Sequence, residues 1–247
     1  MSSTRHLDWP GVFNVRDLGG LAAAGGRRTA SGALVRADSL SRLSQAGWAA
    51  LVEYGIRTVV DLRNDAEREQ SPDVASRPEL VTTVQVPIDG SEDHAFWAPI
   101  ERSPEFGTPL YYRAHLMRKP QLSAAALRAI ARAQPGGVVV HCVAGRDRSG
   151  MVAMLALSLL GVSAQDIGED YGLSDERLQG LWQQLGMEDP APELAAFLAQ
   201  RGTNAREVIA TTLCTLDVEA TLRSGGLSDE DLAALRHRLL EPADDAS

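Results

Sequence analysis

The sequence is poor in cysteine and lacks a long apolar run. Only two of its 247 residues are cysteines, Cys142 and Cys214, too few for a disulfide framework or a cysteine-only zinc site. The longest strongly apolar stretch, residues 151–162, is too short to span a bilayer, and the first ten residues lack the apolar core of a secretory signal. We therefore expect a cytoplasmic protein without stable membrane association, and the role of Cys214 stays open.

Basic residues are outnumbered, with 24 Lys and Arg against 33 Asp and Glu and a net charge of -9. Because such a chain repels phosphate backbones and anionic lipid surfaces, no nucleic-acid partner is expected. Any bound anion must be held by a few local donors. The 44% of hydrophobic residues can form a full core, so we predict one domain over residues 10–240 between flexible termini at 1–9 and 241–247.

Short β-branched runs alternate with helical patterns through the first two thirds of the chain. This alternation predicts an α/β fold with a mostly parallel central sheet flanked by helices. A Gly-rich N-terminal hairpin is expected around Gly25 and Gly26. The predicted strands cover residues 56–62, 81–88 and 138–142. After residue 163 only helices are expected, over residues 163–171, 174–186, 192–202, 204–213 and 228–240.

The stretch HCVAGRDRSG, residues 141–150, follows an apolar strand and opens an apolar helix. A chain that turns this sharply from strand to helix can point successive backbone N–H groups inward and form an anion-binding nest. The guanidinium of Arg148 can hold two oxygens of a bound phosphate, and Gly145 and Gly150 allow tight turns and a close approach. The sequence therefore predicts a phosphate-binding loop here.

The same positive field acts on Cys142, which is expected to be largely thiolate near neutral pH and hence nucleophilic. Ser149 can donate a hydrogen bond to the sulfur and ease its departure as a leaving group. His141 is expected to order the loop through its ring nitrogens rather than to act as an acid or base.

The pattern of Cys142, five residues, Arg148 and Ser149 resembles the signature of the cysteine-dependent protein tyrosine phosphatases. Together with FNVRDLGG at 13–20, TVVDLR at 58–63 and DYGLS at 170–174, it resembles the bacterial tyrosine/serine phosphatase family often described as dual- or triple-specificity.

This resemblance implies hydrolysis of phosphotyrosine, and also of phosphoserine or phosphothreonine, through a cysteinyl-phosphate on Cys142. It implies no metal and no cofactor, since the loop supplies the positive field. Phosphate is expected to be bound by the loop residues Val143, Ala144, Gly145, Arg146, Asp147 and Arg148. Arg16 and Asp17, within FNVRDLGG, are expected to support the loop rather than to touch the ligand.

Three carboxylates compete for the role of general acid, because the chain has no Trp-Pro-Asp string of the kind many tyrosine phosphatases use. Asp147 lies inside the loop, Asp89 ends the strand at 81–88, and Asp61 ends the strand at 56–62. We rank them in that order, with Asp61 otherwise a supporting residue.

Two alternatives to a protein phosphatase stay open. Arg146, where the family commonly has Lys, adds charge that favours a phosphoinositide substrate. A phospho-binding module with weak turnover is favoured if all three candidate acids are distant from the pocket. Residues 90–120, with four prolines and five aromatic residues, form either ordinary core or a mobile lid over an aryl phosphate. The oligomeric state is not predicted.

Overall fold

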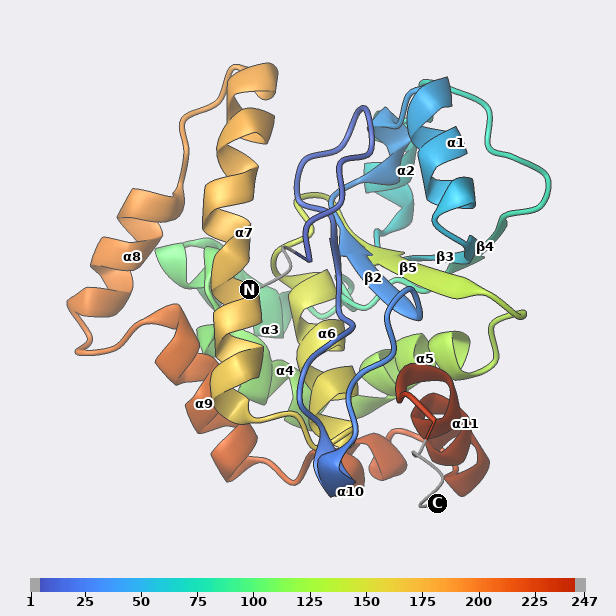
Figure 1. Ribbon diagram of the computed structural model, residues 1–247. Coiled ribbons are helices and arrows are strands. Elements are labelled where there is room, and N and C mark those ends of the chain that lie inside the picture. The colour runs from blue at the N-terminus through green and yellow to red at the C-terminus, as the bar shows by residue number, and fades with distance from the viewer. Residues whose placement is uncertain (1–4, 243–247) are drawn as a thin grey trace.

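The computed structural model describes residues 5–242 and contains one five-stranded sheet with helices on both faces (Figure 1). The strands are β1 (Arg16–Asp17), β2 (Leu34–Ala37), β3 (Ile56–Asp61), β4 (Thr82–Gln85) and β5 (Gly137–His141). The longer helices are α1 (Gln45–Glu53), α2 (Asp65–Gln70), α3 (His94–Glu101), α4 (Tyr112–Arg118), α5 (Pro120–Ala131), α6 (Arg148–Leu159), α7 (Ala164–Leu185), α8 (Ala191–Ala199), α9 (Ala205–Thr215), α10 (Val218–Ser224) and α11 (Asp229–Leu239).

The strand order is β1-β2-β5-β3-β4, and every neighbouring pair is parallel except β1 with β2. Strands β3 and β5 are the apolar runs IRTVVD and GVVVH, and β5 is buried throughout, as expected for the centre of a parallel sheet. The predicted mostly parallel sheet is confirmed. The carboxyl ends of β2, β3 and β5 therefore meet at one edge.

Two apolar clusters pack on opposite faces of the sheet. Helix α1 covers one face through Trp48 and Leu51, and it is capped by Ser44, whose hydroxyl accepts from the Gly47 N–H. The other face is covered by α5 and α6, and α6 is buried along almost its whole length. Figure 1 shows α1 above the sheet and α5 and α6 below it.

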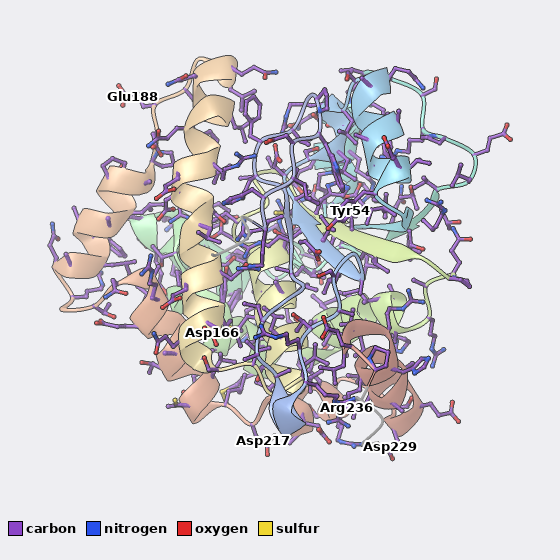
Figure 2. The ribbon with its side chains drawn as sticks, in the orientation of Figure 1. Tyr54, Asp166, Glu188, Asp217, Asp229 and Arg236 are labelled. Atoms are coloured by element: carbon purple, nitrogen blue, oxygen red, sulfur yellow. The ribbon has the colours of Figure 1, made fainter. Side chains whose placement is uncertain are left out.

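The C-terminal third is helical as predicted, but its helices are divided differently. The two helices expected over residues 163–171 and 174–186 form the single helix α7, and an additional helix, α10, follows α9. Gly168 and Gly172 lie inside α7, where a Cβ would come within 3.2 Å and 3.0 Å of atoms of Arg206, so the glycines allow a close approach of α9. Asp166, Asp217 and Asp229 lie at the N-terminal ends of α7, α10 and α11, and Figure 2 shows Asp217 and Asp229 at the lower edge of the molecule.

Residues 90–120 are mainly helical, consisting of α3, α4 and two short 3-10 turns at Pro104–Gly107 and Pro109–Tyr111. Trp97, Tyr111 and Tyr112 are buried and join the core beneath α6. The segment therefore contributes to the core, and whether any part of it opens over a ligand stays a prediction.

The N-terminal hairpin is confirmed, with Ala22 bridged to Arg28 around Gly25 and Gly26. Within the predicted flexible N-terminus, residues 5–9 are packed: Trp9 is buried, and the Leu7 N–H donates to the Val15 carbonyl. Residues 1–4 and 243–247 lie outside the described residues. In the part that the structure describes, no helix combines the length and apolar character needed to cross a bilayer.

Candidate active site

The predicted phosphate loop lies at the carboxyl end of the central strand β5. His141 is the last residue of β5, and α6 begins at Arg148. Gly145 has a φ of +67°, and a Cβ at this position would lie 2.5 Å from the backbone of Ala37 and Asp38 at the end of β2. Glycine is therefore required both for the turn and for its contact with the neighbouring strand.

The carbonyl groups of the loop face the surrounding protein. Each of these carbonyls accepts at least one hydrogen bond from a residue outside the loop. The Ser39 N–H donates to Val143 (2.9 Å), and Asn14 Nδ2 donates to Ala144 and Gly145 (3.1 Å each). Arg36 donates from Nε to Gly145 (3.0 Å) and from Nη2 to Arg146 (2.7 Å), and the Tyr112 hydroxyl donates to Asp147 (2.8 Å). Within residues 5–242, the N–H groups of 143–147 donate to no protein acceptor. With the carbonyls held outward, these N–H groups are available to an anion, as a nest requires.

A buried carboxylate organises the arginines behind the loop. Asp170 of α7 pairs with Arg36 (3.0 Å), Arg16 (3.1 Å) and Arg5 (2.9 Å), and Arg16 also binds the side-chain oxygen of Asn14 (2.7 Å). Burial alone would raise the pKa of Asp170, but the guanidinium groups of Arg16, Arg36 and Arg5 hold it well below its ordinary value. The anionic Asp170 thus fixes Arg36, which in turn fixes the loop.

Two predicted supporting residues, Ser149 and His141, lie beside Cys142. The hydroxyl of Ser149 lies 3.7 Å from the Cys142 sulfur, within hydrogen-bonding range for sulfur. Nδ1 of the fully buried His141 lies 3.2 Å from the Cys142 carbonyl oxygen. Burial lowers the pKa of His141 to about 4, so its ring is neutral at physiological pH.

Arg148 reaches across the loop to two carboxylates on other elements. It makes a two-point contact with Glu67 of α2 (both distances 2.6 Å) and a 2.8 Å contact with Asp89, which follows β4. Glu67 is also the third helical residue of α2 and completes a capping box with Asn64. Burial alone would lower the pKa of Arg148, but Glu67, Cys142 and Asp89 raise it above its ordinary value.

A pocket of about 320 Å³ opens above Cys142. Its lining includes the loop residues Cys142, Val143, Ala144, Asp147 and Arg148. Its walls carry three aromatic side chains from the segment 90–120: Trp97, Phe106 and Tyr111. This shape and lining can accept a flat ring that carries a phosphate at its tip.

Two of the three candidate acids line this pocket. Burial raises the pKa of Asp89 and of Asp147 above its ordinary value, against the opposing effect of Arg148 on Asp89 and of Arg146 on Asp147. The carboxylate of Asp147 accepts from the Tyr171 hydroxyl (3.1 Å). Asp61 does not line the pocket: it is buried at the end of β3 beside His141 and is ion-paired with Arg63 (2.8 Å).

The side chain of Arg146 does not line the pocket either. It is 6% exposed, faces the ring of Tyr171 and pairs with Asp175 (3.2 Å) on α7. The hydrogen-bond partners of the Asp17 carboxylate do not belong to the phosphate loop. It accepts from the N–H groups of Gly19 and Gly32 and from the hydroxyl of Tyr54 (2.7 Å), which is labelled in Figure 2. Asp17 therefore ties the hairpin, whereas Arg16 supports the loop through Asn14 and Asp170.

The family model described as the tyrosine phosphatase family matches residues 7–241. The chain belongs to the tyrosine phosphatase family.

Within this tyrosine phosphatase family, a protein of Cupriavidus necator is 35% identical over 181 residues, covering 70% of this chain and 64% of its own. A tyrosine-protein phosphatase of Nostoc commune is 33% identical over 60% of this chain and 50% of its own. The triple specificity protein phosphatase PtpB of Mycobacterium tuberculosis is 28% identical over 94% and 98% of the two chains. The chain thus spans half to two thirds of the first two relatives.

Several residues of this tyrosine phosphatase site are not identified by sequence reasoning. Arg36 has a visible signal, a charged residue inside the apolar strand LVRA, and Asn14 and Asp170 lie within the quoted motifs FNVRDLGG and DYGLS. Glu67 has none, because an acidic residue in the first turn of a helix is ordinary.

Proposed function

We propose that this protein is a metal-independent phosphomonoesterase that hydrolyses phosphotyrosine through a cysteinyl-phosphate on Cys142. The observation that supports it most directly is the outward position of the carbonyls of residues 143–147, which leaves their N–H groups for a phosphate beside the cysteine. The N-terminus of α6 adds its positive dipole end at the same place.

In the proposed first step, the Cys142 thiolate attacks phosphorus, a sulfur–phosphorus bond forms and the bond to the tyrosine oxygen breaks. Arg148 exchanges its contact with Glu67 for two phosphate oxygens, and the loop N–H groups bind the equatorial oxygens as their charge develops. In the second step water attacks the same phosphorus, the bond to sulfur breaks, and inorganic phosphate leaves.

We assign the proton donor to Asp89. It lies 2.8 Å from the guanidinium that would hold the phosphate, and burial raises its pKa, so that it can carry a proton for the leaving oxygen and then take one from water. Asp147, ranked first from the sequence, becomes the second candidate, because its carboxylate contacts the Tyr171 hydroxyl whereas that of Asp89 contacts the guanidinium that would hold the phosphate.

The aromatic pocket walls favour phosphotyrosine over the smaller phosphoserine and phosphothreonine. The name of the Mycobacterium tuberculosis relative makes those residues reasonable secondary substrates. The phosphoinositide alternative depended on Arg146, but the side chain of Arg146 pairs with Asp175 and is not part of the pocket lining. The binding-module alternative depended on all candidate acids being distant from the pocket, whereas Asp89 and Asp147 line it.

The test is hydrolysis of a phosphotyrosine peptide in the presence of a metal chelator. We expect full activity with chelator, no turnover in Cys142→Ser, and a trapped phosphoenzyme in rapidly quenched wild type. Activity that requires an added divalent metal, or that persists in Cys142→Ser, would show that the proposal is wrong.

A further inference from the structure

Lys119 is the only lysine in the chain; the other 23 residues counted as Lys or Arg are arginines. It lies between α4 and α5, its side chain is almost fully buried, and only 5% of the residue is exposed. A buried ammonium is costly unless several acceptors surround it. The surroundings of Lys119 therefore indicate what it is needed for.

The ammonium of Lys119 is bound to the backbone that carries Asp89. Its Nζ donates to the carbonyl oxygens of Gly90 (2.6 Å) and Asp89 (3.3 Å) and lies over the rings of Phe96 (5.0 Å) and Trp97 (5.6 Å). The contact with the carboxylate of Asp93 is longer, at 3.5 Å. The closest partners of the charge are thus main-chain oxygens and not a counter-ion.

Gly90 is shaped to receive this lysine. Its φ is +56°, and a Cβ there would lie 2.9 Å from both Cδ and Nζ of Lys119. A guanidinium is larger and planar, so it cannot occupy the same space with the same two contacts. This gives a physical reason for lysine at one position in a chain that otherwise uses arginine.

Two further side chains converge on the Asp89 carbonyl. The indole Nε1 of Trp97 donates to it (3.0 Å), and Nε2 of the buried His115 lies 3.3 Å from it. The peptide after Asp89 is therefore contacted by three side chains, while the carboxylate of the same residue contacts Arg148 (2.8 Å).

We propose that Lys119 is a positioning residue for Asp89, holding the turn at residues 89–90 so that the carboxyl group is aimed at the leaving oxygen. This rests on the proposed role of Asp89 as proton donor. A proton donor must lie within about 3 Å of the oxygen it protonates, so a small shift of the turn weakens acid catalysis without disturbing Cys142 or the loop.

The readout is the dependence on the leaving group. Phenyl phosphate, like phosphotyrosine, needs a proton on its leaving oxygen, whereas 4-nitrophenyl phosphate releases a stable anion and needs it much less. We expect Lys119→Met to lower kcat/KM for phenyl phosphate about tenfold, part of the roughly hundredfold or greater effect of acid catalysis, and to change that for 4-nitrophenyl phosphate less than about twofold.

The matched control is Arg118→Met, since Arg118 is the adjacent basic residue, is exposed, and binds Asp93 but neither Asp89 nor Gly90. It should leave both rates unchanged. If Lys119→Met does not fold, Lys119→Arg takes its place, because it keeps the charge and is expected to show the same selective loss to a smaller extent.

An equal loss on both substrates, or no loss on either, would overturn the positioning role. Asp89→Asn, measured in parallel, separates the two proposals. If Asp89→Asn shows the selective loss and the Lys119 variants do not, only the role of Lys119 is wrong. If Asp89→Asn lowers both rates equally, Asp89 is not the acid, and both assignments are overturned.

Discussion

At the scale of single residues, Arg36 connects the sheet, the loop and α7. It is 1% exposed, and its guanidinium binds the carbonyls of Gly145 and Arg146 on one side and the carboxylate of Asp170 on the other. Five fixed N–H groups in one plane match this set of acceptors, which the single ammonium of a lysine does not.

We predict that Arg36→Lys raises both KM for an aryl phosphate and the inhibition constant of inorganic phosphate about tenfold. One charged hydrogen bond to the loop contributes about 1.5 kcal/mol or more, and its loss lets the N–H groups turn away from the ligand. Steady-state kinetics with phosphate as a competitor measure both constants.

Arg177→Lys is the control, because Arg177 also binds a backbone carbonyl, that of Phe13, but no carbonyl of the loop. It should change neither constant. Unaltered phosphate inhibition in Arg36→Lys would mean that the loop keeps its shape without this residue.

At the scale of elements, the unit that matters is β5, the loop and α6, packed against the end of β2. Gly145 and Gly25 have nearly the same backbone conformation, with φ of +67° and +68°, but different surroundings. A Cβ at Gly25 would meet nothing within 4 Å, whereas at Gly145 it would meet the backbone of β2. The two positions separate the conformational effect from the packing effect.

We expect Gly25→Ala to lower the free energy of unfolding by about 1 kcal/mol, the strain of a left-handed alanine, with activity intact. Gly145→Ala should cost more and reduce kcat/KM about a hundredfold, because the loop must move away from β2. Denaturant unfolding and kinetics on both variants check this. Equal stability losses with equal activity would contradict the contact between loop and strand.

At the scale of the whole molecule, buried histidines link stability to pH. Burial lowers the pKa of both His115 and His141 to about 4, below the ordinary value of about 6.5. Between these values the unfolded chain binds protons that the folded protein does not. Stability therefore falls as the pH falls from about 6.5 toward 4.

We predict that each of these histidines removes about 2 kcal/mol from the free energy of unfolding between pH 7 and pH 5. His115→Gln should lose this share and keep that of His141, so its stability changes less over the interval than that of the wild type. Urea unfolding at the two pH values measures the difference. An identical pH dependence in wild type and variant would show that His115 does not titrate in this way.

Sequence alone determined the features that depend on neighbouring residues. The strand, the glycine turn and the apolar helix around Cys142 and Arg148 are adjacent in the chain, so their order is sufficient to predict a phosphate loop. The same holds for the parallel strands, whose short apolar runs are local patterns. The predicted break between helices at 163–171 and 174–186 was wrong. Local propensity counts Gly172 against a helix, but it does not include the close contact with α9 that the glycines of α7 allow.

Only the tertiary structure decided which charges meet. The contacts of Arg148 with Asp89 and Glu67 span 59 and 81 residues, and that of Arg36 with Gly145 spans 109. The sequence could only rank the three candidate carboxylates, and the fold then placed Asp89 and Asp147 in the pocket lining and paired Asp61 with Arg63. Electrostatic pairing depends on separation in space, and that separation is set by packing the sheet and helices together.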